Sequence, residues 1–271
     1  ITSGESKQLS PLITNNNNDI TKINKIEVKT LTNKNNKLLC YNNNLNSNPL
    51  YNTQFYSTKT LSSFVTSIVD VCWSIQLEMF VAVTSSSTGN NYNILYSYNG
   101  IDWIVINAGT FVLYGICWSP ELSLFVACGQ NCILTSNNGI NWTNQTSPAN
   151  YRWQSICWSP ELSLFATVAQ SPGTTSAIAT SPDGITWTLR TSRNVSWQKI
   201  IWVSNLNLFI KIGLSTTTSI STSPDGINWT ARTTPNVNWY GITYSNTLNL
   251  LVAVSNSTTT NKIMTSTDGI T

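Results

Sequence analysis

A repeat constrains the fold of this chain more than any other feature. A marker aromatic residue returns at spacings of 45, 40, 44 and 42 residues. Repeats of this length, when each holds several short strands, are typical of propeller blades or solenoid coils. Each unit can bury its apolar face only against its neighbours, so the chain is expected to form an array of similar units. The marker residues are Trp73, Trp118, Trp158, Trp202 and Tyr244.

A second motif, Ser-x-Asp/Asn-Gly-Ile-x-Trp, follows each marker and predicts a turn. Residues 181–187 and 223–229 are nearly identical, 97–103 and 136–142 are looser copies, and 266–271 stops one residue before the expected Trp. Gly takes the positive φ of such a turn, and the Asp or Asn side chain accepts hydrogen bonds from backbone N–H groups ahead of it. The alternation of Ile and Trp after the turn predicts a strand with one buried face. The residues predicted to have a structural role in these turns are Asn99, Asn138, Asp183, Asp225, Asp268, Gly100, Gly139, Gly184, Gly226 and Gly269.

One repeat holds four expected strands, at 153–159, 164–169, 177–181 and 185–189. A Pro-Glu-Leu-Ser turn, a loop of variable length and the Asp-Gly turn connect them in that order. Four antiparallel strands in about 40–45 residues make one propeller blade. The predicted fold class is therefore all-β, as a β-propeller-like array of four-stranded antiparallel blades.

The repeat divides the chain into two parts. Residues 61–271 are predicted to form the β-propeller, with five repeats of which the last is truncated. Residues 1–60 are rich in Asn and are expected to be an N-terminal arm or the end of a preceding domain. A degenerate first blade is a further reading of this part, because 39–41 resembles 116–118. Since the chain starts with Ile and ends inside a motif, we expect it to be a piece of a longer protein.

Charge is sparse and uneven, which bears on the partners. Residues 1–60 hold seven Lys against three acids, a net charge of +4, while 61–271 hold seven Lys and Arg against eight acids, a net charge of −1. The repeat region is therefore not expected to bind nucleic acid, which requires a basic surface. No stretch approaches the ~20 apolar residues of a membrane span.

The cysteines are expected to be small buried residues. Cys72, Cys117 and Cys157 precede the marker Trp of successive repeats, so they are expected to lie too far apart for a disulfide. Cys128 and Cys132 flank a short loop, where both a disulfide across a hairpin and two free thiols fit the sequence. The chain has no His, and no Cys or carboxylate spacing suits a metal, so neither a metal nor a cofactor is expected.

No catalytic constellation stands out, and we expect the chain not to be an enzyme. Asp183 and Asp225 occupy identical turns, as do Glu121 and Glu161, so these acids are expected to be structural. Nothing in the spacing of the remaining acids pairs two carboxylates across a sugar, as a glycosidase requires. Without His, the chain also lacks Ser-His and Cys-His nucleophile pairs.

Candidate binding residues lie in the loops between the second and third strands, which vary from three residues to about ten. The loops are 84–93, 129–131, 170–176, 214–219 and 255–261. Variable loops of a repeat protein commonly gather on its binding face, although simple drift in length also explains them. Trp153, Trp197 and Trp239, five residues before a marker, either pack in the core or stack on a sugar. The candidate loop residues are Tyr92, Gln130 and Ser171.

The turn motif resembles the Asp-box of sialidases and other propellers, although Asp and Gly are adjacent here and the usual motif has one residue between them. The longer pattern, Ile-Cys-Trp-Ser-Pro-Glu-Leu with Thr-Ser-Pro-Asp-Gly-Ile, is similar to propeller-like repeats in structural proteins of large DNA viruses and some phages. The resemblance implies a virion protein that contacts capsid proteins or a host surface protein or glycan. The alternatives are a carbohydrate-binding propeller and a sialidase-like hydrolase fragment whose catalytic residues lie outside this chain, with an extracellular or cell-surface location.

Overall fold

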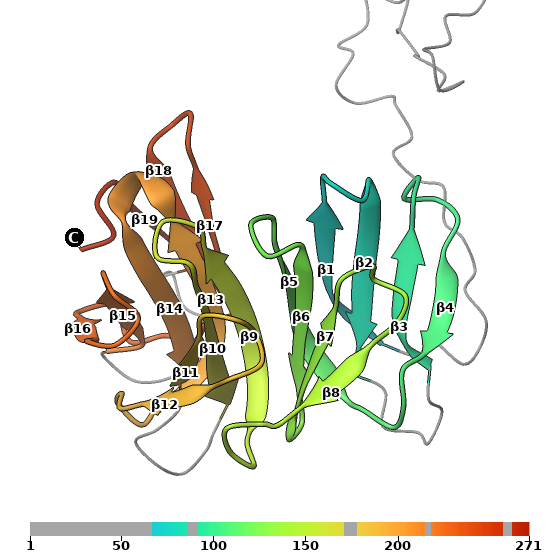
Figure 1. Ribbon diagram of the computed structural model, residues 1–271. Helices are drawn as coiled ribbons and strands as arrows, with labels where there is room; N and C mark the ends of the chain where they lie inside the picture. The colour runs from blue at the N-terminus through green and yellow to red at the C-terminus, as the bar shows by residue number, and fades with distance from the viewer. Residues whose placement is uncertain (1–66, 86–91, 171–177, 215–217, 257–261, 271) are drawn as a thin grey trace, which may run out of the picture. The chain divides into compact units, whose positions relative to one another are not determined.

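The computed structural model describes residues 67–85, 92–170, 178–214, 218–256 and 262–270, all within the compact unit Lys59–Thr271. These residues form five antiparallel sheets, which follow one another along the chain (Figure 1). The predicted domain boundary at residue 60 lies outside the described residues. The strands are β1 (Ile68–Ser74), β2 (Met79–Thr84), β3 (Tyr92–Ser97) and β4 (Ile104–Asn107) in the first sheet; β5 (Leu113–Ser119), β6 (Leu124–Gly129), β7 (Cys132–Ser136) and β8 (Thr143–Gln145) in the second; β9 (Arg152–Ser159), β10 (Leu164–Gln170), β11 (Ile178–Ser181) and β12 (Thr188–Arg190) in the third; β13 (Ser196–Val203), β14 (Leu208–Leu214), β15 (Ile220–Ser223) and β16 (Thr230–Arg232) in the fourth; and β17 (Trp239–Ser245), β18 (Leu250–Ser255) and β19 (Ile263–Ser266) in the fifth.

Each sheet is a simple meander, in which every strand pairs with the strand that follows it. Four sheets have four strands, and the described part of the fifth has three. The only helical element among the described residues is a single 3-10 turn at Ser204–Leu206. The prediction of an all-β chain made of four-stranded antiparallel units is confirmed.

The first strands of consecutive sheets are neighbours, so β1, β5, β9, β13 and β17 follow one another through the array. The array curves, because Lys199 in β13 reaches back to Asp70 in β1, with 3.3 Å between Nζ and Oδ1. This contact joins the fourth sheet to the first. The first strands are therefore the innermost elements of the array.

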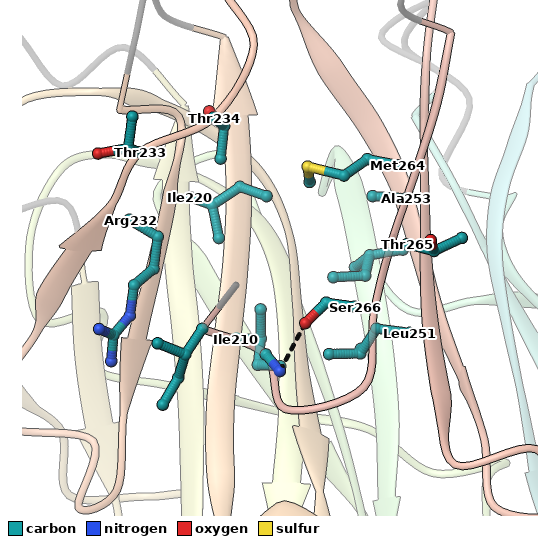
Figure 2. Close-up of a pocket in the computed structure, with 13 residues that line it drawn as sticks. Ile210, Ile220, Arg232, Thr233, Thr234, Leu251, Ala253, Met264, Thr265 and Ser266 are labelled. Atoms are coloured by element: carbon teal, nitrogen blue, oxygen red, sulfur yellow. Dashed lines mark hydrogen bonds between the residues drawn. The ribbon is translucent and has the colours of Figure 1, made fainter.

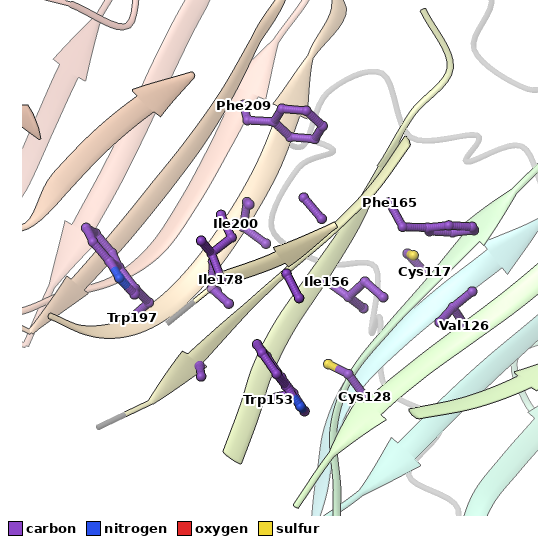
Figure 3. Packing of buried hydrophobic residues seen from close by; sticks show 14 of the residues in the cluster. Cys117, Val126, Cys128, Trp153, Ile156, Phe165, Ile178, Trp197, Ile200 and Phe209 are labelled. Atoms are coloured by element: carbon purple, nitrogen blue, oxygen red, sulfur yellow. The ribbon is translucent and has the colours of Figure 1, made fainter. Parts of the chain in front are cut away.

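Apolar side chains fill the spaces between consecutive sheets. In the second, third and fourth sheets, the marker Trp packs against the Phe of the second strand, with ring centroids 4.4–4.7 Å apart. Phe165 and Phe209 lie in one buried cluster that spans the second to fourth sheets (Figure 3). These rings contribute most to the buried area, since a buried aromatic side chain covers about 150–250 Å².

In the second, third and fourth sheets, the marker Trp also links its sheet to the one before it. Trp158 donates its indole N–H to Glu121 of the second sheet over 2.7 Å, and Trp202 donates to Glu161 of the third sheet over 2.6 Å. Trp118 of the second sheet donates in the same way to Gln76 of the first sheet over 2.8 Å. The expectation that the two glutamates are structural fits this geometry, because each is a hydrogen-bond acceptor between sheets.

The fourth strands begin later than the sequence predicts. The expected strand 185–189 is observed as β12, which begins at Thr188. The reason is that Asp183 Oδ1 accepts the N–H groups of Ile185 and Thr186, so these groups are not free to pair with β11. The Ile-x-Trp segment is thus part of the turn, and Ile185 is exposed.

The cysteines are free thiols in the described residues, including Cys128 and Cys132. Burial raises the pKa of the Cys132 thiol to about 12, and it also raises the pKa of the Cys128 thiol. Thiols held protonated in this way are poor nucleophiles and poor metal ligands, because the thiolate is the reactive form. The packing role predicted for the cysteines agrees with this environment.

Candidate functional site

The two ends of each sheet differ, and we name them by their connections. The turn end carries the connections between the first and second strands and between the third and fourth strands. The loop end carries the connections between the second and third strands and the starts of the first strands. The predicted structural residues lie at the turn end, and the predicted binding residues lie at the loop end.

The Asp-Gly turns of the turn end are closed by the same hydrogen bonds in each sheet. In the third sheet, Ser181 Oγ accepts the Gly184 N–H over 2.8 Å and donates to Asp183 Oδ1 over 2.9 Å. Gly184 has a φ of 74°, a conformation in which a Cβ would be strained. The corresponding glycines, Gly100, Gly139, Gly226 and Gly269, have φ between 70° and 72°.

The side chains of Asp183 and Asp225 are held ionised by these turns. Partial burial alone would raise their pKa, but the N–H groups that each carboxylate accepts favour its charged form. The net result lowers the pKa of Asp183 and lowers that of Asp225 to about 2. In the first two sheets, Asn99 and Asn138 accept the corresponding N–H groups over 2.7–3.0 Å, so the turn needs an oxygen acceptor rather than a charge.

At the loop end, the described residues include one complete second-to-third loop, at 129–131. Asn131 takes a φ of 58° and donates its N–H to Tyr151 O over 2.9 Å. Gln130 is exposed and forms an isolated bridge with Arg152. Tyr92 is the first residue of β3. The central parts of the four longer loops, including Ser171, lie outside the described residues, so the predicted binding loops stay a prediction.

The three tryptophans proposed as a sugar platform lie in the core. Trp153, Trp197 and Trp239 each have 0% of their surface exposed. Figure 3 shows Trp153 beside Cys128, and Trp197 among the buried residues of the same cluster. A ring without an exposed face cannot stack on a sugar, so that alternative is wrong and the core alternative holds. They are buried because the sheets pack on each other as far as the strand starts.

A set of residues at the loop end was missed by the sequence reasoning. Each of the five first strands has a β-bulge near its start. At the bulge, one residue of the first strand has no partner in the second strand. A bulge re-aims a side chain and is common beside functional sites. The skipped residues, which we call the bulge set, are Val69, Tyr114, Gln154, Gln198 and Tyr240.

The bulge set differs in chemistry from sheet to sheet, while the residue before each of its members is apolar. Tyr240 is 41% exposed and Val69 is 42% exposed. Arg152 lies over the Tyr114 ring, 4.0 Å from its centroid, and donates to Gln154 over 3.0 Å. The loop end therefore offers tyrosine rings, amides and a cation. The available signal was the variation four residues before each marker aromatic.

Residues one position after the bulge set connect the first strands. Asp70 Oδ2 accepts the N–H of Ile116 in the next sheet over 3.1 Å, and Ser155 Oγ accepts the N–H of Ile200 over 3.2 Å. Asp70 also pairs with Lys199. These contacts occupy both oxygens of the Asp70 carboxylate, which thus connects the first sheet to the second and the fourth sheets.

Lys211 in β14 has a buried amine, whose contacts are a hydroxyl group and two indole rings. Its Nζ donates to Ser192 and lies 4.0 Å and 4.2 Å from the ring centroids of Trp197 and Trp229. Burial lowers the pKa of Lys211 well below its ordinary value, because it removes the charged form of the amine from water. The corresponding residues in the other sheets are Ala82, Ala127, Thr167 and Ala253.

Within the described ranges, no three His, Cys, Asp or Glu side chains gather in a way that would hold a metal ion. The same part of the chain contains no helix with the length and apolar character of a membrane span.

The comparisons with known proteins agree on the fold alone. Neither the family models nor the curated proteins gave a match. Among solved structures, a streptogramin B lyase aligns with a TM-score of 0.59 at 12% identity, over 76% of this chain and 70% of its own. A chain of a nidogen/laminin complex aligns with a TM-score of 0.53 at 10% identity, over 69% of this chain and 75% of its own. An ancestral GH74 enzyme aligns with a TM-score of 0.56 at 17% identity, over 70% of this chain and 27% of its own. This chain is therefore β-propeller-like in fold.

Proposed function

We propose that this chain is a non-enzymatic structural or interaction module, which binds a partner protein or a glycan through its loop end. The observation that carries the proposal is the bulge set, in which the same backbone position presents valine, tyrosine or glutamine in successive sheets. A scaffold that repeats its backbone and varies its side chains at one end has the character of a recognition surface.

The environment of the ionisable groups supports a non-enzymatic role. Asp183 and Asp225 hold turns, Glu121 and Glu161 accept hydrogen bonds between sheets, and Asp70 pairs with Lys199. Each of these groups has a structural task and none faces a second carboxylate in those contacts. The similarity to two enzyme folds does not argue against this, because one fold hosts many functions.

We place the module in a virion, as a component associated with a capsid or a fibre that contacts other structural proteins or a host surface. The support is the resemblance of the repeat to those of large DNA viruses and phages. The likeness to the Asp-box rests on the sequence motif, whose residues Ser181, Asp183 and Gly184 form a turn between β11 and β12 in this chain. That likeness concerns a structural turn and assigns no hydrolase activity.

The test combines loop and bulge variants. Loop 84–93 is shortened to a two-residue Asn-Gly turn, and the other three long loops are treated in the same way, one at a time. Attachment to host cells and co-assembly with capsid proteins are then measured with variants whose melting temperature is unchanged. We expect at least one variant to lose about tenfold or more in binding, the equivalent of ~1.4 kcal/mol. Full retention by all loop variants and by Tyr114→Ala and Tyr240→Ala would contradict the proposal.

A carbohydrate-binding propeller is a second candidate, favoured by the exposure of Tyr240 and the position of Tyr114 under Arg152. Tyrosine rings and amides at one end suit a sugar, which offers both apolar faces and hydroxyl groups. A glycan array distinguishes the two candidates. Glycan binding that Tyr240→Ala weakens supports this second candidate. Binding to a protein without any glycan signal supports a module that recognises a partner protein.

A further inference from the structure

Charge is divided between the two ends of the sheets. The segments that join or follow strands at the turn end hold seven acids and no Lys or Arg. The segments at the loop end, counted from the last residue of one strand to the first residue of the next, hold five cations and no acid. The loop end is therefore the basic end of the array, although residues 61–271 as a whole carry a net charge of −1. The five cations are Arg152, Arg190, Arg193, Arg232 and Lys262.

Two of these arginines are bonded to their own sheets. Arg232, the last residue of β16, donates its Nε–H to Thr222 over 2.9 Å, and Arg190 makes the corresponding bond in the third sheet. Figure 2 shows the Arg232 side chain pointing away from Thr233 and Thr234, which follow it at the loop end. The guanidinium group of Arg232 thus lies along the sheet rather than beyond its end.

Arg152, the first residue of β9, has a different environment. Its guanidinium carbon lies 4.0 Å from the centroid of the Tyr114 ring, and its Nε–H donates to Gln154 Oε1 over 3.0 Å. Among the described residues, no group accepts a hydrogen bond from its two Nη atoms. The ring and the amide therefore hold the guanidinium in one orientation and leave its pair of Nη donors available to a ligand.

The chain offers no carboxylate to this pair of donors. Asp70 is the one acid of residues 61–271 that lies outside the turn end. Its two oxygens accept the N–H of Ile116 and pair with Lys199. The two Nη groups of an arginine match the two oxygens of a carboxylate, which they bind through parallel hydrogen bonds. The geometry of Arg152 is therefore suited to a carboxylate of another molecule.

The groups beside Arg152 favour a sugar over an acidic polypeptide. Gln154 lies on the same strand, and Gln130, which forms a β-bridge with Arg152, is exposed beside Asn131. Each of these three amides can both donate and accept hydrogen bonds, as sugar hydroxyl groups do. The centre of a protein interface is instead typically apolar and depleted of charge. No exposed aliphatic side chain is among these neighbours of Arg152.

We propose that Arg152, with Tyr114 and Gln154, binds the carboxylate of an acidic sugar, such as a uronic acid unit of a glycan. The two Nη groups donate to the carboxylate oxygens, and the amides of Gln154 and Gln130 bond to hydroxyl groups of the sugar. The other loop-end cations strengthen the attraction through their positive field. The inference rests on the proposed function, because it takes the loop end as the recognition surface.

The probe is trigalacturonic acid, titrated into the 271-residue chain and followed by isothermal titration calorimetry. Its control is the methyl ester of the same trisaccharide, which keeps the hydroxyl groups and lacks the charge. We expect saturable binding of the acid and affinity at least about tenfold lower for the ester, because hydrogen bonds to a charged group are the stronger ones. Binding of the acid is also expected to weaken as the salt concentration rises.

Two variants of the chain locate the site. Arg152→Gln is expected to lower affinity for the acid about tenfold and to leave affinity for the ester nearly unchanged. Arg193→Gln removes the same charge from an exposed position of the loop end and is expected to lower affinity less than about threefold. If Arg152→Gln does not fold, the comparison of the acid with its ester on the unaltered chain decides the question.

Several results would overturn the inference. These are equal affinity for the acid and the ester, equal losses in Arg152→Gln and Arg193→Gln, or tighter binding of a Glu-Glu-Glu peptide than of trigalacturonic acid. The last result would assign the site to an acidic polypeptide. The attachment and assembly assays with loop variants do not depend on a charged sugar. A loop variant that loses attachment, together with no preference for the acid, would therefore keep the proposed function and reject this inference alone.

Discussion

The turn end and the loop end of the same sheets follow opposite rules. At the turn end, Ser181, Asp183 and Gly184 have equivalents with nearly identical hydrogen bonds throughout the array. At the loop end, the bulged backbone is constant but the bulged residue changes from Tyr114 to Gln154. A position whose side chain forms the turn cannot vary without loss of stability, whereas a bulge leaves its side chain free to vary. Residues that recognise a partner can therefore change at the loop end without loss of the fold, whereas the turn residues cannot.

The largest effect is expected for a core residue at the loop end. Trp153→Ala should lower the free energy of unfolding by about 3–5 kcal/mol, because it leaves a large cavity in a cluster that spans three sheets. Urea denaturation measures this. Tyr240→Ala, at an exposed position of the same end, is the matched control and should change stability by less than about 0.5 kcal/mol. Equal effects of the two substitutions would contradict the distinction between the buried tryptophans and the exposed bulge set at this end.

Lys211 is a difference between sheets that lies in the core, so its variants test whether such differences are confined to the loop end. Burial places the folded-state pKa of Lys211 below its unfolded value of 10.5, so between these values the unfolded chain binds more protons. Its contribution to stability therefore rises as pH rises through this window, by at most about 1.4 kcal/mol per pH unit for one proton. Lys211→Met should be more stable than the unaltered chain at neutral pH and should lack this slope.

Urea denaturation at pH 7 and pH 9 gives the free energies of unfolding of the unaltered chain and of Lys211→Met. The titration of all other groups is common to both chains and cancels in the difference between them. Thr167 occupies the same position in the third sheet, so Lys211→Thr is a second variant with a residue that the scaffold accepts. If both variants keep the slope of the unaltered chain, the amine is not buried as described. A loss of partner binding in a stable Lys211 variant would extend recognition beyond the loop end.

At the turn end, the prediction separates the hydrogen bonds from the charge. Asp225→Ala, like Asp183→Ala, should destabilise by about 0.5–1.5 kcal/mol, the usual net contribution of a hydrogen bond. Because the folded pKa of Asp225 is about 2 against an ordinary 3.8, its charge-dependent contribution is present above pH 3.8 and is lost as pH falls toward 2. Asp225→Asn should keep the turn, as Asn138 does, and should flatten that acid dependence.

Thermal denaturation from pH 2 to pH 7 measures both effects. Neither variant should lose partner binding while it remains folded, because the turn end is not the proposed recognition surface. Loss of binding at an unchanged melting temperature would make these turn residues part of a binding site.

The smallest effect concerns the contact between sheets. Glu161→Ala removes the acceptor of the Trp202 indole and should cost about 1 kcal/mol. Glu161→Gln should cost less than about 0.5 kcal/mol, since Gln76 accepts the same bond from Trp118. Chemical denaturation of both variants tests this, and a large cost for Glu161→Gln would show that the carboxylate charge matters.

The sequence predicted the units of this fold well because the repeat supplies the same local signals several times over. The four strands per unit, the Asp-Gly turns and the Pro-Glu-Leu turns follow from periodicity and turn chemistry. The start of β12 was missed because the Ile185 N–H donates to the Asp183 carboxylate instead of pairing with β11, which the alternation of Ile and Trp does not reveal. The burial of Trp197 also had no local signal, since it depends on how closely consecutive sheets pack.

The candidate site was less predictable for a similar reason. A β-bulge is a property of two paired strands, so the spacing within one strand does not show that Tyr114 or Tyr240 is skipped. Loop length directed attention to the loop end, whose binding role stays a prediction, whereas the sugar-stacking alternative for Trp153 and Trp239 is excluded by their burial.

The indole bonds between sheets set how unfolding spreads through the array. Trp202 and Trp158 donate to a carboxylate of the preceding sheet, and Trp118 donates to an amide. In the fifth sheet, Tyr244 replaces the Trp and its hydroxyl bonds to Asn249 of the same sheet. Because nearest-neighbour coupling decides the cooperativity of a repeat protein, the first to fourth sheets should melt as one block while the fifth opens first, as a separate subdomain with its own lower free energy.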